Sequence, residues 1–432
     1  MPTLEIALLS GRSCCLTVEP EETIWALRDR AQKELGVGIS VWLNSRTGKA
    51  LKRFSTVAAE GLQDGDLVTA SARQAKLTSN HRFSRVLALI RPNGSVVTWG
   101  HPQGGGDSEL VQRTLALRDV IQIQATASAC AALRDDGTVV TWGRKRFGGD
   151  SLWVQGQLRE IQKIQATSGA FCALRADGST VAWGSVRHGG DSKVQLANVK
   201  DIVATQGAFG ALQADGHVIT WGRHRAGGNA ELCDVELLCA AAFSFAALRS
   251  DGLVQLLGAP SAVDLGEVSS LVASAETFAA LRKDGSVALV TAQNSETVRL
   301  LETKYALREI CTSAFAFAGI TNESTVVAWG APEFGGDSSG VEAQLKEVKQ
   351  ICATESGFAA LRQDGLVVSW GTKGGDSQEV RHLLKDIQQI ESSSGAFAAI
   401  RADGLVVTWG QADAGGSPNG RVKEQLRNVH EL

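Results

Sequence analysis

The sequence is poor in several residues that mark common classes of protein. Proline contributes only 7 of the 432 residues, and methionine and tyrosine contribute one each. Low proline together with 47 glycines and 44% apolar residues is typical of an ordered chain with many tight turns. The formal net charge of −3 argues against a protein that coats nucleic acid or a membrane with its whole surface.

The sequence also shows no C-x-x-C pair, no long apolar run and no visible signal peptide. No two cysteines show C-x-x-C spacing, and most lie in apolar runs where cysteine packs as a small hydrophobic residue. We therefore expect reduced thiols in an intracellular protein, with no metal and no cofactor. No signal peptide is visible at residues 1–5, and no apolar run approaches the ~20 residues of a membrane span. The sequence favours the cytosol or the nucleus without choosing between them.

Catalytic signatures are absent as well. The chain has no G-x-S-x-G nucleophile motif and no phosphate-binding Walker loop, and its seven histidines are scattered. We therefore expect a protein that binds other macromolecules and is not an enzyme.

What the sequence does contain is a motif that returns nine times. The copy at residues 130–143 reads CAALRDDGTVVTWG, and equivalent positions are 33 to 43 residues apart. Asp-Gly or Asn-Gly marks a turn in every copy but one, where Glu323-Ser324 replaces it. In seven copies a tryptophan lies five residues after the second turn residue, and Leu257 and Val290 replace it in the other two. These tryptophans are Trp99, Trp142, Trp183, Trp221, Trp329, Trp370 and Trp409.

Each copy reads as a β-hairpin preceded by another short strand. One three-stranded unit cannot cover both of its faces, so neighbouring units must stack, and a ring leaves only short edges. The chain ends on residues 427–432, which resemble a first strand without a hairpin, whereas the repeats begin at 85–89 with a hairpin that lacks a first strand. We predict a closed ring in which these two ends complete one unit, with the tryptophans buried between units.

These repeats resemble those of the regulator of chromosome condensation family. The pattern Ala-Leu-Arg-x-Asp-Gly-x-Val-x-x-Trp-Gly and the small-residue strand Ala-Thr-x-x-x-Phe carry the resemblance, which covers residues 82–432. It implies a mainly β protein, a closed β-propeller of three- to four-stranded blades. Family propellers usually have seven blades with longer repeats, and the shorter period here is more similar to the propeller-type β-lactamase inhibitor proteins. The nine copies therefore leave seven to nine blades open.

Residues 1–73 follow a different pattern, and residues 74–81 are expected to be a linker. Strands are predicted at 3–8, 13–18, 41–43 and 66–70, with a helix at 24–35 that Thr23 caps. This order of elements, with Leu-Thr-Val-Glu-Pro at 16–20 and Gly-Lys-x-Leu at 48–51, resembles ubiquitin and implies an α+β β-grasp domain. The chain continues beyond Arg73 without a Gly-Gly terminus, so conjugation is not expected. Binding to ubiquitin-pathway proteins and a mere packing or solubility role both remain open.

The loops that follow Trp-Gly are basic in three consecutive copies. The basic residues are Arg144, Lys145, Arg146, Arg187, His188, Arg223, His224 and Arg225. The matching positions in later copies are mostly neutral or acidic, as at Glu333 and Asp413. We predict one positive sector, on the face opposite the Asp-Gly turns, that attracts an acidic protein segment or a phosphate backbone. The alternative is a set of solvated loop charges.

Gly-Gly-Asp-Ser loops recur at residues 148–151, 189–192, 335–338 and 374–377. Calcium takes six to eight oxygen ligands, and each loop offers a single aspartate, so no metal site is expected. A turn in which Asp and Ser bond backbone amides is the favoured interpretation.

The resulting functional hypothesis is a monomeric scaffold or adaptor that binds proteins and links a propeller-bound client to the ubiquitin pathway. A nucleic-acid partner is less favoured, and no membrane partner is expected. The alternative that the family resemblance implies is a guanine-nucleotide exchange factor or chromatin-binding regulator of a small GTPase. An exchange factor of that family inserts a wedge, and no copy here carries a long insertion.

Overall fold

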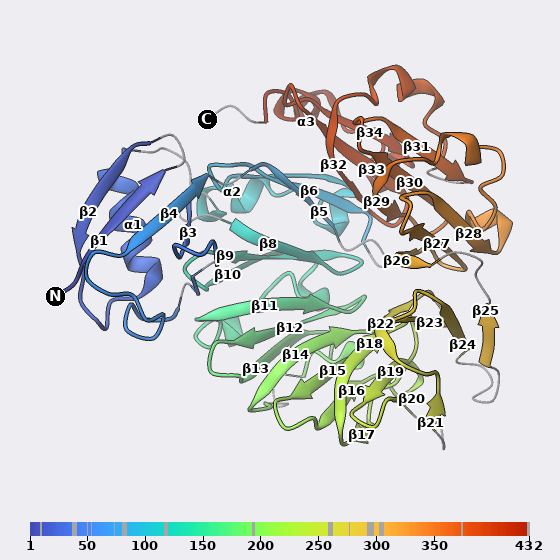
Figure 1. The fold of residues 1–432 in the computed structure, drawn as a ribbon, viewed down its shortest axis with the longest axis horizontal. Coiled ribbons are helices and arrows are strands. Elements are labelled where there is room, and N and C mark those ends of the chain that lie inside the picture. Colours follow the sequence, from blue (N-terminus) through green and yellow to red (C-terminus); the bar gives the residue numbers. More distant parts are fainter. Residues whose placement is uncertain are drawn as a thin grey trace.

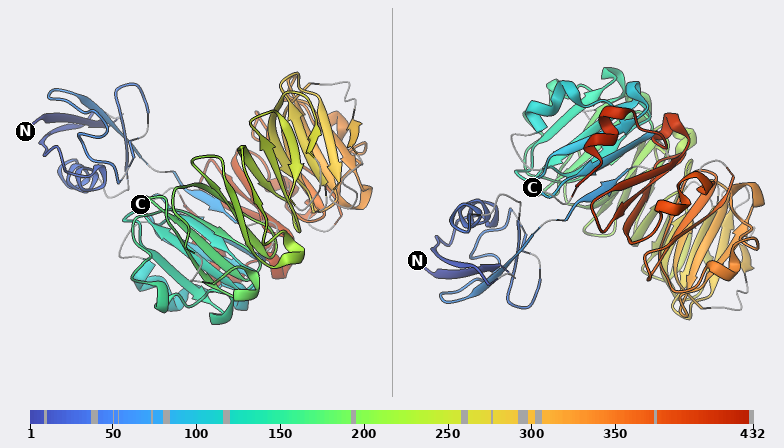
Figure 2. Two further views of the ribbon diagram at one scale, coloured as in Figure 1. Left: turned by 90° about the horizontal axis from the view of Figure 1, so that it is seen from below. Right: turned by 90° about the horizontal axis from the view of Figure 1, so that it is seen from above.

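The computed structural model is mainly β, with an N-terminal domain beside a long series of small sheets (Figures 1 and 2). It describes the chain except residues 9–10, 37–40, 50, 53, 73, 80–83, 116–119, 192–194, 258–261, 276, 292–297, 302–305, 373–374 and 430–432. None of the helices in the described part is long and apolar enough to cross a bilayer.

The N-terminal domain is one four-stranded sheet covered by a helix. Its elements are β1 (Thr3–Leu8), β2 (Ser13–Thr17), α1 (Ile24–Glu34), β3 (Val41–Asn44) and β4 (Leu67–Ala72). The strand order is β2-β1-β4-β3, and β1 pairs with β4 in parallel. The hydroxyl of Thr23 accepts a hydrogen bond from the amide of Ala26 at 3.3 Å, which confirms the predicted helix cap. Leu27 and Ala31 bury one face of α1 against the sheet.

Nine sheets follow, numbered here sheet 1 to sheet 9 in chain order. Sheets 1 to 3 contain β5 (Lys76–Thr78), β6 (Val86–Ile90), β7 (Val96–Gly100); β8 (Val120–Ala125), β9 (Ala129–Arg134), β10 (Val139–Gly143); and β11 (Ile161–Ala166), β12 (Ala170–Arg175), β13 (Thr180–Gly184). Sheets 4 to 6 contain β14 (Val199–Ala204), β15 (Ala208–Gln213), β16 (Val218–Gly222), β17 (Glu231–Leu232); β18 (Val235–Ala240), β19 (Phe245–Arg249), β20 (Leu253–Leu256), β21 (Ala262–Asp264); and β22 (Val268–Ala273), β23 (Thr277–Arg282), β24 (Val287–Thr291), β25 (Val298–Leu301). Sheets 7 to 9 contain β26 (Leu307–Thr312), β27 (Ala316–Thr321), β28 (Val326–Gly330); β29 (Val348–Ala353), β30 (Gly357–Arg362), β31 (Val367–Gly371); and β32 (Ile387–Ser392), β33 (Ala396–Arg401), β34 (Val406–Gly410).

Each sheet is an antiparallel meander of three strands, and sheets 4 to 6 add a fourth, outer strand. Two short helices lie outside the sheets, α2 (Gln112–Leu115) and α3 (Gly420–Gln425). The expected three strands per repeat are thus present in all nine copies. Sheets of three and four strands agree with the three- to four-stranded units that the family resemblance implies. The sequence does not indicate which copies carry the fourth strand, because β17, for example, has only two residues and no alternating apolar pattern.

Neighbouring sheets are joined by a repeated contact of the tryptophans. In sheet 3, the indole Nε1 of Trp183 donates to the carbonyl of Gly148 in sheet 2 at 3.1 Å, and its ring stacks on Phe171 with centroids 5.3 Å apart. Gly148 has φ +95°, and a Cβ there would lie 2.5 Å from Cδ2 of Phe171. Only glycine allows the loop to approach so closely. The same bond joins four further pairs: Trp99 to Gly415, Trp142 to Gly105, Trp221 to Gly189 and Trp370 to Gly335.

Two tryptophans depart from this rule. Trp329 stacks on Phe317 but is only half-buried, and its Nε1 has no acceptor among the described residues. The preceding copy, in sheet 6, has no Gly-Gly loop in its sequence, and the segment in the equivalent place, residues 292–297, lies outside the described residues. Trp409 is buried and stacks on Phe397, but Gly374, which occupies the acceptor position in sheet 8, lies outside the described residues.

Sheets contact one another in chain order, and sheet 9 also packs against sheet 1, as the neighbouring red and blue sheets of Figure 1 show. Leu77 of β5 exchanges hydrogen bonds with the side chain of Gln389 in β32, at 3.3 and 3.4 Å. Leu77 and Trp99 share a hydrophobic cluster with Ala398, Ile400 and other residues of sheet 9. The two ends of the repeat region are therefore in contact.

The strand that completes sheet 1 differs from the one expected. It is β5, which lies within the expected 74–81 linker and directly precedes its hairpin. Three residues among polar neighbours are too short to be recognised as a strand, although Leu77 is fully buried. At the C-terminal end, the amide of Val429 donates to the carbonyl of Gly404 at 2.9 Å, as the amide of Ile161 does to Gly137, but residues 427–429 are not part of a strand. Residues 430–432 of that segment lie outside the described residues.

The buried carboxyl of Glu391 in β32 allows the packing around this strand to be tested through the pH dependence of stability. Burial raises the pKa of its carboxyl to about 7, although the Ser392 amide and the charge of Lys76 oppose the shift. An acid whose folded pKa exceeds its unfolded value holds more protons when folded, so its contribution to stability is complete below pH ~4.5 and is lost as pH rises to about 7. We expect Glu391→Gln to be more stable than the native chain at pH 8.5 by about 2 kcal/mol, and to differ little at pH 4.5. Urea denaturation at the two pH values checks this, and parallel stability curves would contradict it.

Candidate partner-binding site

The predicted basic residues lie on three loops built in the same way. Each third strand ends on Trp-Gly, and a single turn of 3-10 helix follows: η3 (Lys145–Phe147) in sheet 2, η5 (Val186–His188) in sheet 3 and η6 (His224–Ala226) in sheet 4. A glycine with positive φ closes each turn, as at Gly148, Gly189 and Gly227. The loops therefore leave the ends of equivalent strands with the same local geometry, on sheets that contact one another in order.

Most of these side chains reach solvent. Seven are exposed, and His188 is half-buried: the exposed ones are Arg144, Lys145, Arg146, Arg187, Arg223, His224 and Arg225. We call these eight residues the basic sector. Within the described residues, Arg187, Arg223 and Arg225 form no ion pair. Lys145 lies 3.5 Å from Asp150, and Arg144 bonds the side-chain oxygen of Gln103 in sheet 1.

His188 lies close enough to positively charged side chains of two sheets to be affected by both. Its pKa is lowered, first by burial and then by the positive charges of Arg223 and Arg187. Its Nδ1 lies 2.9 Å from the hydroxyl of Ser185, and its ring packs where a Cβ on Gly169 would be. Because Arg223 belongs to sheet 4, the positive potential extends from one sheet to the next. His188 is therefore a mainly neutral member of the basic sector near pH 7.

The equivalent loops of sheets 7 and 9 carry acidic residues instead. Sheet 7 carries Glu333 at this position, and sheet 9 carries Asp413, which pairs with Arg85 at 2.9 Å. Basic side chains are thus concentrated on sheets 2 to 4, as the sequence predicts. Their role in binding remains a prediction.

The Gly-Gly-Asp-Ser loops are turns. The carboxylate of Asp150 accepts a hydrogen bond from the amide of Leu152 at 3.1 Å, and that of Asp337 accepts one from Ser339 at 2.9 Å. Hydrogen bonds from Ser339 lower the pKa of Asp337. The described residues contain no group of three His, Cys, Asp or Glu placed to hold a metal. Ser192 and Gly374, which complete two of these loops, lie outside the described residues.

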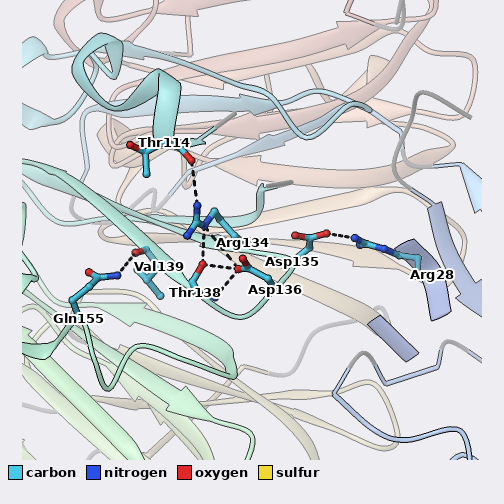
Figure 3. A network of polar contacts seen from close by, with 8 residues as sticks. All are labelled: Arg28, Thr114, Arg134, Asp135, Asp136, Thr138, Val139 and Gln155. Carbon is cyan, nitrogen blue, oxygen red and sulfur yellow. Dashed lines mark hydrogen bonds and ion pairs between the residues drawn. The ribbon is translucent and has the colours of Figure 1, made fainter. Parts of the chain in front are cut away.

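A polar contact joins the N-terminal domain to sheet 2 (Figure 3). The guanidinium of Arg28 on α1 pairs with the carboxylate of Asp135 at the β9–β10 turn, and both side chains are largely buried, at 11% and 3% exposed. Phe54 packs on the same turn, where a Cβ on Gly137 would collide with its ring. Arg134 turns away from this contact and donates to the carbonyl of Thr114 at 3.2 Å.

Sequence reasoning missed this contact, although a signal was available. Asp135 directly precedes the turn Asp-Gly, and no other copy has an acidic residue there. The other copies carry Pro92, Ala176, Ala214, Ser250, Lys283, Asn322, Gln363 and Ala402. A buried carboxylate requires a partner, so this one exception among nine copies points to a contact outside the repeat.

Comparison with known proteins adds little to this geometry. No protein-family model and no curated protein sequence matches the chain. Prp20p from Saccharomyces cerevisiae is similar in structure, with 15% identity over 73% of this chain and 80% of its own, and a TM-score of 0.39. The WD40 ectodomain of the Arabidopsis thaliana receptor kinase ACR4 has 17% identity over 58% and 93%, with a TM-score of 0.36. The computationally designed Ika8 protein has 16% identity over 69% and 97%, with a TM-score of 0.40. Likeness at this level carries no inference about function.

Proposed function

We propose that this chain is a protein-interaction scaffold, in which the repeat sheets form a closed nine-bladed β-propeller and the basic sector binds an acidic segment of a partner protein. One observation carries the proposal: six arginine and lysine side chains, together with His224, are exposed on equivalent loops of three adjacent sheets. Packing of sheet 9 on sheet 1 supports the closed ring. A rigid ring that displays variable loops is a common architecture for recognition.

An acidic protein segment suits this surface better than a nucleic acid. Nucleic-acid binders usually carry a basic stripe on a basic domain, whereas this chain has a net charge of −3. The cluster of basic loop residues lies on three consecutive sheets, whereas Glu333 and Asp413 occupy the equivalent loops of sheets 7 and 9. Such a local patch steers and orients a partner of opposite charge.

The test is a charge-reversal variant, Arg144→Glu/Arg187→Glu/Arg223→Glu. We expect it to bind a glutamate-rich peptide at least about 10-fold more weakly at low salt and with a flatter salt dependence, because opposite charges now repel. Fluorescence anisotropy at several salt concentrations measures both effects.

The matched control is Lys346→Glu/Lys349→Glu/Lys385→Glu, which makes the same charge change at exposed sites outside the basic sector. Equal losses in the two triple variants would refute a specific sector. Stronger binding of duplex DNA than of the peptide by the native chain would favour the nucleic-acid alternative.

We further propose that the N-terminal domain is a ubiquitin-like adaptor that couples the bound partner to ubiquitin-pathway proteins. Its sheet order, its single covering helix and the sequence resemblance support this assignment. Titration of the full chain with a ubiquitin-receptor peptide, followed by NMR of the β1–β4 amides, checks it. No shift at saturating peptide concentration would leave the domain a structural module only.

A further inference from the structure

The outer rim of sheets 1 and 2 carries apolar side chains that point into solvent. After each Asp-Ser turn the chain forms a short 3-10 helix, η2 (Glu109–Val111) in sheet 1 and η4 (Leu152–Val154) in sheet 2. The two segments have the same register, because the side-chain amides of Gln112 and Gln155 donate to the third-strand carbonyls of Val96 and Val139, both at 3.1 Å. Leu110 and Trp153 therefore occupy equivalent positions on adjacent sheets.

These two side chains are almost completely exposed. Leu110 is 100% exposed and Trp153 is 86% exposed, whereas the next residue in sheet 2, Val154, is buried. When the copies are aligned on the Asp-Ser pair of each turn, the position of Leu110 and Trp153 is occupied by Gly340 in sheet 7 and by Glu379 in sheet 8. The position accepts small or charged residues, so the fold does not require a large apolar side chain there. Leu152, also exposed, extends the patch beside Trp153.

The Trp153 end of this apolar pair is linked to the basic sector. Asp150 joins the two, since its carboxylate lies 3.5 Å from Nζ of Lys145 and also accepts the amide of Leu152. Leu152 is thus hydrogen-bonded to an aspartate that contacts the basic loop of sheet 2, and Trp153 is the next residue in the chain. On sheet 3, Val186 is exposed within the basic loop itself. Tryptophan and arginine are the side chains that most often dominate the energy of protein interfaces.

We infer that Leu110 and Trp153 form the hydrophobic anchor of the same binding surface, and that the partner is an acidic peptide segment carrying a bulky apolar side chain. This inference rests on the proposed function of the basic sector, and it specifies the partner's chemistry. The acidic part of the segment lies over the loops of sheets 2 to 4, and its apolar side chain packs on the rim of sheets 1 and 2. Charge complementarity selects this occupant over a second copy of the chain, whose surface is nearly neutral on average.

The experiment is selection of a displayed random-peptide library on the full chain. We expect the selected peptides to combine acidic residues with Trp, Phe, Leu or Ile. Anisotropy with one selected peptide then compares the native chain with Trp153→Ala and Leu110→Ala. We expect Trp153→Ala to weaken binding by about 10-fold or more, as loss of an interface anchor does, while the salt dependence stays unchanged.

The matched control is Phe243→Ala, which removes another exposed apolar side chain, on sheet 5. Native binding by this control together with a loss in Trp153→Ala supports the inference. Acidic peptides without an apolar residue, or peptides that bind Trp153→Ala as well as the native chain, would overturn it and leave the basic sector intact. Selected peptides without acidic residues would overturn the proposed function as well.

Two other occupants are distinguished by the same variants. If Trp153→Ala weakens binding of a single-stranded oligothymidylate more than binding of the peptide, the tryptophan is a base-stacking platform and the inference is wrong. If the native chain dimerises in sedimentation and Trp153→Ala does not, the patch is a self-association surface, which likewise overturns it.

Discussion

Replacement of Gly148 by alanine is expected to destabilise the chain by about 2–4 kcal/mol, a large part of the stability of a typical domain. The new Cβ would lie 2.5 Å from Cδ2 of Phe171, in a backbone conformation that only glycine adopts readily. The loop would have to move away, and the bond from Trp183 to the Gly148 carbonyl would be lost. Urea or thermal unfolding followed by tryptophan fluorescence measures the effect.

Gly156 supplies the matched control, because it lies in the same connection between β10 and β11. A Cβ there would meet nothing within 4 Å, and its φ is not in the left-handed region. Gly156→Ala is therefore expected to leave stability within about 0.5 kcal/mol of native, or to raise it slightly. Equal effects of the two alanines would show that the tryptophan–glycine contact does not hold the sheets together.

Replacement of Asp135 by alanine is expected to release the N-terminal domain from sheet 2. The variant leaves the Arg28 guanidinium without its carboxylate in a largely buried contact, and breaking such a pair costs about 3–5 kcal/mol. Interfaces between domains of one chain resemble transient protein–protein interfaces, so loss of a buried ion pair is expected to allow the two domains to move relative to each other. Small-angle scattering should show a larger radius of gyration, and limited proteolysis should cut faster between the N-terminal domain and β6.

The double variant Arg28→Ala/Asp135→Ala separates the pair from other effects. Removing both charges avoids the unpaired cation, so we expect the double variant to dock better than Asp135→Ala alone. Arg175→Ala is the control, because Arg175 pairs with Asp177 at 3.1 Å within one hairpin of sheet 3. Release of the N-terminal domain by this control would show that the assay reports general destabilisation and not docking.

The sequence predicts the repeat sheets well because the signals for each hairpin lie within its own copy of the motif. The Asp-Gly turn sets the hairpin register, and the apolar runs on either side are long enough to be recognised. The tryptophan positions are equally readable, and six of the seven are buried as expected. Trp329 is the exception, because its environment depends on the preceding copy and not on its own.

Features that depend on contacts between distant segments could not be read in this way. Strand β5 is recognisable only from its pairing with β6, and the fourth strands only from the edges that they cover. The basic residues were identified from the sequence, but their nearness in space follows from the order in which sheets 2, 3 and 4 contact one another. The Arg28–Asp135 pair joins two domains, and the sequence around either residue does not indicate the position of its partner.

The bond from Trp99 to Gly415 also has a consequence for synthesis on the ribosome. The four other bonds of this type in the described part of the chain join sheets that are neighbours in sequence, so those interfaces can form as the chain emerges. Sheet 1 is made before the other eight sheets, yet the carbonyl that accepts its indole hydrogen is 316 residues further along the chain. A nascent chain stalled before Gly415 would therefore hold eight partly formed interfaces and an exposed Trp99, a state in which chaperones rather than the repeats themselves must protect the growing end from aggregation.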